Sequence, residues 1–402
     1  MPTNISLTTA ELMKQAQNMR PELTSRRRDF HQHPELSFQE VRTAAAVTDL
    51  LTELGLDVQI GVGGTGVVGL LRGGKPGRTL AIRADMDALP MQEQTEVPYR
   101  SLNPGVMHAC GHDAHMAIVL GAATLLKSMR EELVGNIKFI FQPAEETPPG
   151  GAPGMIEQGV LEEPHVDAVL GLHMYIEVPV GKIALRIGQF LCGMAGFKLT
   201  VLGKGAGGSV PHRGVDGIAV AAQVISNLQM MISRGVNPLG SATLTVTEIH
   251  GGGAGHIMAD RVAMRGMVDS LAPDVMGEIP ARMEKIIAGV TQAHGAGYEF
   301  SFEPAYPPLI NDRAMAGLIT AAGTDLLGAE NVLADFHPVM AADDFAYFSN
   351  ARPGAMVLIG IGNPQQGITY PHHHPRFDID EDSLPVGAAL IAAVARRYLT
   401  SS

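Results

Sequence analysis

The sequence predicts an α/β fold in which a mixed, mostly parallel sheet is flanked by helices and a smaller α+β domain is inserted. Short apolar runs of β character alternate with segments of helical pattern through the first half of the chain, as they do in parallel sheets. From about residue 197 the order becomes strand, helix, strand, strand, helix, strand. We therefore expect one domain formed by residues 1–190 and 305–402, and an inserted domain formed by residues 191–304.

The first domain is expected to begin with a helix, because Thr9-Ala-Glu-Leu resembles a capping box. A second helix is expected over about residues 37–54, where apolar residues recur at helical spacing and Gly55 marks the end. Four apolar runs follow, with a further helix at about residues 113–130 between them. The expected strands are residues 66–71, 79–83, 136–141 and 168–173.

The inserted domain begins with an expected strand, residues 197–202, which leads into a glycine-rich loop from Gly203 to Ser209. The chain then returns to the first domain, whose last helix is expected at about residues 385–399. The remaining elements of the inserted domain are a helix at about 217–233, strands near 242–249 and 261–270, a helix at about 274–294 and a strand at 299–303.

Composition limits the classes of function. With 402 residues and 46% hydrophobic residues, the chain can bury a sizeable core, and its net charge of −12 argues against nucleic-acid binding. The segment from Met1 to Arg20 lacks a basic start followed by an apolar core, so we expect no secretory signal, and we also expect no membrane span. A cytoplasmic location follows as the expectation, where Cys110 and Cys192 would stay reduced and free to bind metal.

Candidate chemical residues follow the expected strands of the first domain. Asp85 and Asp87 follow one strand, Glu145 and Glu146 follow another, and His173 follows a third. In open α/β sheets, chemistry lies in the loops just past the carboxyl ends of strands. Five separate segments offer ligand-type side chains there: residues 83–90, 108–115, 142–146, 171–173 and 372–378.

These residue types are those that hold a divalent metal ion. Cysteine, histidine and carboxylate are ligands of zinc-like or manganese-like ions, and Cys110 and His112 lie two residues apart in a glycine-containing loop. The adjacent carboxylates of Glu145 and Glu146 repel each other unless a cation holds them. If Glu146 binds metal, Glu145 is free to take a proton from the attacking water.

Each segment also has a plain structural interpretation. The alternatives are a small buried cysteine, a helix-capping histidine, a solvated acidic turn, a hydrogen-bonded strand histidine and a solvated patch of histidines. Taken one at a time these alternatives remain open. A single metal centre accounts for all five segments together, and we therefore favour it.

The segments together resemble the amidohydrolase branch of the aminoacylase/carboxypeptidase metallopeptidase family, which includes hippurate hydrolase, N-acyl-amino-acid amidohydrolases and indole-acetyl-amino-acid hydrolases. The resemblance covers nearly the whole chain, and residues 28–40, 211–216, 342–348 and 353–354 also carry it. It implies an α/β catalytic domain with an inserted ferredoxin-like lid, which usually forms the dimer interface. It also implies metal-dependent hydrolysis of an amide C–N bond in an N-acyl amino acid or a related small amide.

The resemblance further implies two divalent ions, with zinc or manganese preferred and cobalt or nickel as alternatives. In it Glu145 is the general base and later the proton donor to the leaving amine, and Asp87 orients a ligand. Asp85 stands where other branches have a ligand histidine, and Cys110 compensates as a shared ligand. The implied metal ligands are Cys110, His112, Glu146, His173 and His373.

The choice of His373 over His372 and His374 rests on the family pattern, in which the ligand lies two residues before a proline. Pro375 fits that spacing, although the choice among the three histidines stays open.

The inserted domain departs from the family pattern at three positions. Gly207 falls where the family has a histidine that polarises the scissile carbonyl, His256 falls where it has an asparagine, and Asp269 falls where it often has an arginine. Our hypothesis is that His256 takes over the lost polarising role as a catalytic residue. An aspartate at a carboxylate-binding position favours a substrate without an α-carboxylate there, or one with a cation, unless Asp269 simply faces solvent.

Three functions are therefore compared. The first is a two-metal amidohydrolase acting on N-acyl amino acids, and the second keeps the metal centre but acts on a non-peptidic amide or an aryl amine. The third is a binding protein with weakened catalysis. The expected partners are a small-molecule amide and a second copy of the chain bound through the lid, with neither nucleic acid nor membrane.

Overall fold

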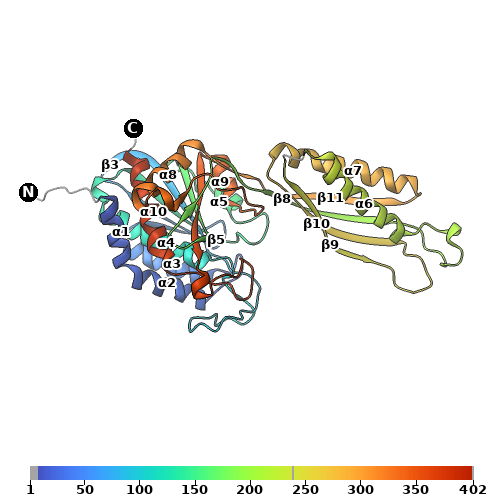
Figure 1. Cartoon of the computed structure of the whole chain (residues 1–402), viewed down its shortest axis with the longest axis horizontal. Helices are drawn as coiled ribbons and strands as arrows, with labels where there is room; N and C mark the ends of the chain where they lie inside the picture. Colours follow the sequence, from blue (N-terminus) through green and yellow to red (C-terminus); the bar gives the residue numbers. More distant parts are fainter. Residues whose placement is uncertain (1–7, 238–239, 401–402) are drawn as a thin grey trace, which may run out of the picture. The chain divides into compact units, whose positions relative to one another are not determined.

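The computed structural model describes residues 8–237 and 240–400, and these residues form two compact units (Figure 1). The larger unit comprises Met1–Gly188, Ile310–His337 and Asp344–Ser402, and the smaller unit comprises Gln189–Leu309 and Pro338–Asp343. Residues 1–7, which belong to the segment expected to lack a secretory signal, lie outside the described part of the chain.

The larger unit is built on an eight-stranded mixed sheet with the strand order β1-β2-β4-β3-β5-β14-β6-β13. The central strands β4, β3, β5 and β14 are parallel to one another, whereas β1, β2 and β4 pair antiparallel. This arrangement confirms the predicted α/β class with a mostly parallel sheet. The strands are β1 (Asp57–Val62), β2 (Gly66–Arg72), β3 (Lys75–Asp85), β4 (Val134–Gln142), β5 (Ala168–Pro179), β6 (Ile183–Ala184), β13 (Val332–Leu333) and β14 (Gly354–Gly362).

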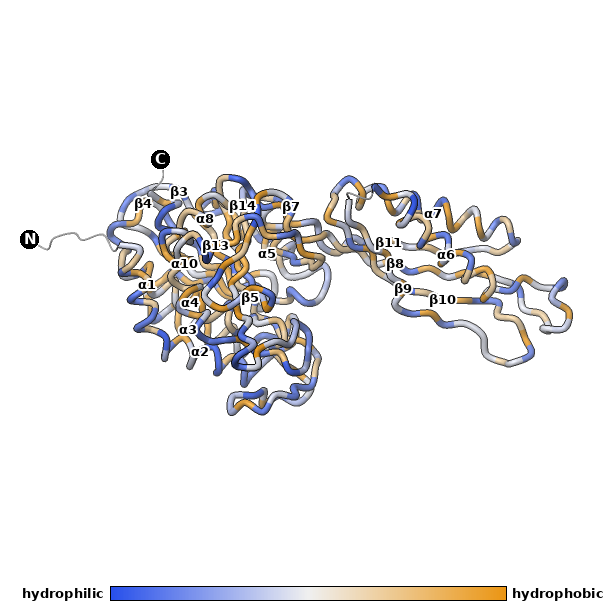
Figure 2. Tube along the Cα trace, viewed as in Figure 1, coloured by the Kyte–Doolittle hydropathy of each residue, from blue (hydrophilic) through white to orange (hydrophobic). Residues whose placement is uncertain are grey.

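The central strands are apolar because both of their faces are covered. Every residue of β14 is buried, and β4 is buried over its last six residues. Figure 2 shows orange, hydrophobic segments within the larger unit. Helices α4 and α10 pack closely, since a Cβ added to Gly387 would lie 2.6 Å from the Ile118 side chain. The helices of this unit are α1 (Thr9–Asn18), α2 (Arg20–Gln32), α3 (Val41–Glu53), α4 (His112–Ser128), α5 (Ala152–Glu157), α8 (Arg313–Leu327), α9 (Phe345–Ala351) and α10 (Ser383–Thr400).

Three local predictions are corrected. The capping box of α1 begins at Thr8 rather than Thr9, because Thr8 and Glu11 exchange side-chain and backbone hydrogen bonds. The helix expected over residues 37–54 begins only at Val41, where the Glu35 carboxylate accepts the N–H groups of the first turn. His173 lies within β5 and not after it, because that strand continues to Pro179.

The smaller unit contains a four-stranded antiparallel sheet with the order β11-β8-β10-β9. Side chains on one face of this sheet pack with two helices into a separate core, while the residues between them on the strands are exposed. The elements follow the order β8 (Gly193–Leu202), α6 (Gly217–Gly235), β9 (Ala242–Gly251), β10 (Arg261–Ser270), α7 (Pro273–Ala293) and β11 (Gly297–Tyr306), and this order and sheet arrangement are ferredoxin-like. The chain passes between the units at β7 (Gly188–Leu191) and β12 (Leu309–Asn311), which form a two-stranded sheet.

Membrane-spanning helices were also considered. In residues 8–237 and 240–400 none of the helices combines the length and the apolar character that crossing a bilayer requires.

Candidate metal centre

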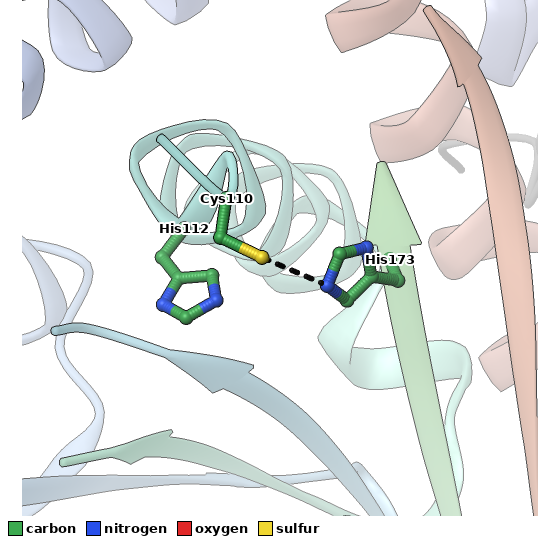
Figure 3. Close-up of side chains that lie close together, drawn as sticks. All are labelled: Cys110, His112 and His173. Carbon is green, nitrogen blue, oxygen red and sulfur yellow. Dashed lines mark hydrogen bonds between the residues drawn. The ribbon is translucent and has the colours of Figure 1, made fainter. Parts of the chain in front are cut away.

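Cys110 and His112 are brought to the sheet by the turn that precedes α4. Gly111 between them has a φ of 91°, a left-handed conformation that glycine adopts without strain. This turn places the Cys110 Sγ atom 3.5 Å from the Nε2 atom of His173 on β5 (Figure 3). Candidate ligands from two distant segments, Cys110 and His112 before α4 and His173 on β5, therefore lie close together.

The hydrogen bonds of two histidines leave the same ring nitrogen directed into this cluster. The Nδ1 atom of His112 donates to the backbone carbonyl of Asp87 at 2.8 Å, and the Nδ1 atom of His173 donates to the carbonyl of Met174 at 2.7 Å. Each ring therefore presents Nε2 as its free ligand atom, as metal-binding histidines usually do. The buried Nε2 of His112 has no hydrogen-bond partner among the described residues.

The two glutamates after β4 complete the cluster. The Oε2 atom of Glu145 lies 3.9 Å from the His112 Nε2, and the Oε1 atom of Glu146 lies 4.0 Å from it. The buried Oε1 of Glu146 also has no hydrogen-bond partner in the described part of the chain. A buried imidazole nitrogen and a buried carboxylate oxygen that make no hydrogen bond cost free energy unless a cation lies between them.

Of the three consecutive histidines, His373 has the geometry of a ligand. Its Nε2 lies 3.3 Å from the Oε1 of Glu146, and its backbone, at a φ of 62°, is fixed by an N–H bond to the Ala109 carbonyl. His372 instead uses its Nε2 on the Met174 carbonyl at 2.8 Å. His374 accepts the N–H of Arg376 at its Nδ1.

Cys110 belongs to two of the sets of ligand atoms that lie within 4.8 Å of one another. One set is Cys110, His112 and His173, and the other is Cys110, Glu146 and His373. The structure thus brings together all the metal ligands that the sequence predicted. Two sets that share one sulfur suit a pair of ions, and the donor types suit a zinc-like or manganese-like metal.

The electrostatics of the cluster favour an added positive charge. Burial alone would lower the pKa of His112, but the carboxylates of Asp85, Asp87 and Glu146 outweigh burial and raise the pKa to about 10. Burial, reinforced by Glu146 and Glu145, raises the pKa of the Cys110 thiol well above its usual range. A divalent cation would stabilise the thiolate and take the place of the proton.

Asp87 supports both glutamates through their backbones. Its Oδ1 accepts the N–H of Glu145 and its Oδ2 accepts the N–H of Glu146, each at 3.0 Å. Burial raises the pKa of Asp87, but hydrogen bonds from His112, Glu146 and Ser37 outweigh burial and lower it, so the carboxylate stays ionised. Asp87 thus holds the backbone of both glutamates, one of which is a candidate ligand, while the ligand-orienting role that the resemblance implied for it stays a prediction.

Asp85 and His115 bond to each other next to the candidate ligand His112. The Oδ1 of Asp85 lies 2.6 Å from the Nδ1 of His115, and its Oδ2 accepts from Arg83 at 2.7 Å. His115 was not singled out from the sequence, although it lies three residues after His112 and so on the same face of α4. Sequence reasoning also assigned no role to Arg83, which donates to Gln142 and Asp344 as well as to Asp85, or to Glu40, whose partners lie in other segments.

The residues that depart from the family pattern lie in the smaller unit. His256 is exposed, and its carbonyl accepts the N–H of Gly208 next to the Gly207–Ile257 bridge, so the two loops pair through their backbones. Burial raises the pKa of Asp269, which accepts a hydrogen bond from the Thr243 hydroxyl. The catalytic role of His256 stays a prediction.

Comparison with known proteins adds a family match. The profile of peptidase family M20/M25/M40 matches residues 81–397. The IAA-amino acid hydrolase ILR1-like 4 of Arabidopsis thaliana is 38% identical over 93% of this chain and 84% of that protein. N-acetylcysteine deacetylase of Bacillus subtilis is 36% identical over 93% of this chain and 96% of that protein. The structure of Bacillus subtilis YXEP protein, a dinuclear metal binding peptidase, has a TM-score of 0.83 and 33% identity, covering 96% of this chain and 100% of that one.

Proposed function

The chain belongs to peptidase family M20/M25/M40 and is an amidohydrolase, and from this premise we propose that it hydrolyses N-acyl amino acids at a two-metal centre with Glu145 as general base. The family resemblance and the amidohydrolase activity predicted from the sequence are confirmed. The observation that carries the proposal is the pair of unpartnered buried atoms, His112 Nε2 and Glu146 Oε1, beside the carboxylate of Glu145.

The proposed ligands divide into two sets around one sulfur. Cys110 is shared, with His112 and His173 contributing to one set and Glu146 and His373 to the other. Zinc or manganese suits this mixture of thiolate, imidazole and carboxylate, with cobalt or nickel as alternatives. Metal analysis of the purified protein, with one ion or fewer per chain at saturation, would contradict the two-ion proposal.

Bound divalent ions would supply polarisation of the scissile carbonyl and a lowered pKa for the attacking water. Glu145 takes a proton from that water while the water oxygen attacks the carbonyl carbon. Glu145 then gives the proton to the leaving nitrogen as the C–N bond breaks, so the products are an amine and a carboxylic acid, which releases its proton to solvent. Asp87 keeps the backbone of Glu145 in place throughout.

N-acyl amino acids are the proposed substrate class because the related proteins are named as an N-acetylcysteine deacetylase and an IAA-amino acid hydrolase. A second candidate is an amide without an α-carboxylate, or one with a cation. The half-buried Asp269 favours it, since a cation could pair with this carboxylate. In either case we propose that His256 polarises the carbonyl, so His256→Ala with normal turnover and full metal content would refute that role.

We also propose that the protein is a homodimer through the smaller unit. Strand β9 is an edge strand of the antiparallel sheet, α6 packs next to it, and Met230 and Ile249 on these elements are 56% and 50% exposed. Light scattering with size-exclusion chromatography tests this, and a monomer at micromolar concentration would contradict it. A cytoplasmic location is proposed because both cysteines are free thiols; cell fractionation tests that location.

The decisive experiment measures metal content and hydrolysis of a panel of N-acyl amino acids for the wild type, Glu145→Gln and the exposed control Glu163→Gln. We expect about two ions per chain in all three proteins, and a loss of about 10²–10⁴-fold in kcat for Glu145→Gln alone. Metal binding with turnover retained in Glu145→Gln would rule out this residue as the base. If the wild type binds metal but cleaves only amides without an α-carboxylate, the second substrate class replaces the first.

A further inference from the structure

Three consecutive backbone N–H groups at the metal centre donate to carboxylates from other parts of the chain. The N–H groups of Glu145 and Glu146 donate to Asp87, as described above. The N–H of Ala144, one residue earlier, donates to the Oε1 atom of Glu40 at 2.9 Å. Glu40 lies 104 residues away from Ala144 in sequence and just before α3.

Glu40 is fully buried, and its carboxylate accepts hydrogen bonds from uncharged donors, Thr65 and the Ala144 backbone among them. The Thr65 hydroxyl donates to Oε2 at 2.5 Å, while Ala144 occupies Oε1. Keeping a carboxyl group buried with only neutral partners costs free energy, so folding alone gives little reason for it. An apolar side chain of similar size would fill this space without that cost, whereas it could not accept the Ala144 N–H.

Ala144 has an unusual backbone, and its conformation sets the direction of the residue that follows. Its φ is 56°, in the left-handed region, where a residue with a Cβ atom loses about 1–2 kcal/mol relative to the right-handed region. Ala144 is also fully buried, between the end of β4 at Gln142 and the catalytic Glu145. A hydrogen bond to its N–H therefore helps to hold the turn that aims the Glu145 side chain.

We propose that Glu40 is a positioning residue for the general base, acting through its hydrogen bond to the Ala144 N–H. Asp87 and Glu40 together fix the backbone from Ala144 to Glu146, with Asp87 supporting the two glutamates and Glu40 supporting the strained residue before them. The inference rests on the proposed function, because Glu145 is the base in that proposal.

Four variants separate positioning from folding. Glu40→Ala removes the acceptor for Ala144, whereas Glu40→Gln keeps a side-chain oxygen there and offers its amide to Thr65. Thr65→Val removes only the second partner of Glu40. Glu35→Gln is the matched structural control, since the Glu35 carboxylate caps the first turn of α3 through Arg42 and Thr43 and has no bond to the turn at Ala144.

For each variant we would measure kcat and KM on an N-acyl amino acid, metal content, the melting temperature, and hydrogen exchange of the Ala144 amide in metal-free protein. We expect Glu40→Ala to lower kcat by about 10²-fold, with KM changed less than about 3-fold and full metal content. Its Ala144 amide should exchange faster. Glu40→Gln and Thr65→Val should keep kcat within about 3-fold of the wild type and keep the protection of that amide.

Unchanged kcat and amide exchange in Glu40→Ala would overturn the proposal. A loss of kcat in Glu40→Gln as large as that in Glu40→Ala would also overturn it. So would a fall in kcat in Glu35→Gln that accompanies its loss of melting temperature, because kcat would then follow stability rather than the Ala144 hydrogen bond. The exchange measurement does not depend on turnover. If the wild type cleaves no N-acyl amino acid, the proposed function fails while the exchange result still reports whether Glu40 holds the turn.

Discussion

The Nε2 atom of His115 accepts a hydrogen bond from the backbone N–H of Met174 at 2.9 Å. A ring nitrogen that accepts a hydrogen bond carries no proton, so the Nδ1 of His115 carries the proton and donates it to Asp85. His115 therefore has no free ligand atom, although its ring lies with Asp85 and His112 in one cluster of potential ligands. Its two hydrogen bonds hold Asp85 and the backbone of Met174, which lies next to His173.

We predict that His115→Ala weakens metal binding without removing it. The Met174 N–H and the Asp85 carboxylate would each lose a partner, and loss of such supporting bonds typically costs about 10–100-fold in metal affinity. Titration of metal-free protein with zinc against a competing chelator measures the change. The stoichiometry at saturation should stay that of the wild type, so loss of a whole ion per chain would mean that His115 is itself a ligand.

Alanine variants of the three consecutive histidines should differ in metal content. His373→Ala should lose one ion per chain at moderate metal concentration, because its Nε2 lies beside Glu146 in a ligand set. His374→Ala should keep full metal content, because its ring accepts a backbone N–H and stacks on Tyr370. His372→Ala should weaken binding only modestly, through Met174. Loss of an ion from His374→Ala but not from His373→Ala would contradict the assignment.

His108 should make metal-free protein sensitive to acid. Burial lowers the pKa of His108 to about 3, well below 6.5, and neither ring nitrogen has a hydrogen-bond partner among the described residues. Between these two pH values the unfolded chain binds a proton at this position that the folded chain does not. The free energy of unfolding therefore falls as the pH is lowered from 6.5 toward 3.

Urea unfolding of metal-free wild type and His108→Leu at pH 4.5 and pH 6 measures this contribution. We expect the free energy of unfolding of the variant to depend less steeply on pH, with a slope smaller by that of about one bound proton. His294→Leu is the control, because His294 is exposed in the smaller unit. An equal pH dependence in the wild type and His108→Leu would show that this ring does not titrate as described.

Breaking the buried ion pair between Arg27 on α2 and Asp113 on α4 should destabilise the larger unit. The Nε of Arg27 lies 2.8 Å from the Oδ2 of Asp113, and both side chains are fully buried. Arg27→Leu would remove the guanidinium group that pairs with Asp113 and would leave this buried carboxylate with the His31 ring at 2.7 Å, so we expect a loss of about 3–5 kcal/mol in the free energy of unfolding. Arg20→Ala, at an exposed ion pair with Asp382, should cost less than about 1 kcal/mol. Equal effects of the two variants would contradict this difference.

The candidate metal ligands could be proposed from the sequence because they are chemically distinctive side chains in short motifs, and the family resemblance implied the full set. Cys110, His112 and Glu146 could be recognised from their types and spacing, and the structure brings them together. The β10 strand was also predicted with its observed bounds, since its buried and exposed residues alternate.

The supporting residues could not be predicted in the same way. Glu40 and His115 act through hydrogen bonds to the backbones of Ala144 and Met174, and a backbone group has no signature in the sequence. Likewise, the late start of α3 depends on a carboxylate from Glu35, which precedes the helix by several residues in a turn. Such partners become visible only when the fold places distant segments side by side.

The sharing of Cys110 between two ligand sets has a consequence for the chemical durability of the enzyme. Cysteine is readily oxidised by peroxide or alkylated by electrophiles as a thiolate, whereas burial and the raised pKa of Cys110 favour its less reactive thiol when no metal is bound. Damage to that single sulfur atom would remove a donor from both ion positions at once. Inactivation by oxidants should therefore be all-or-none for each molecule.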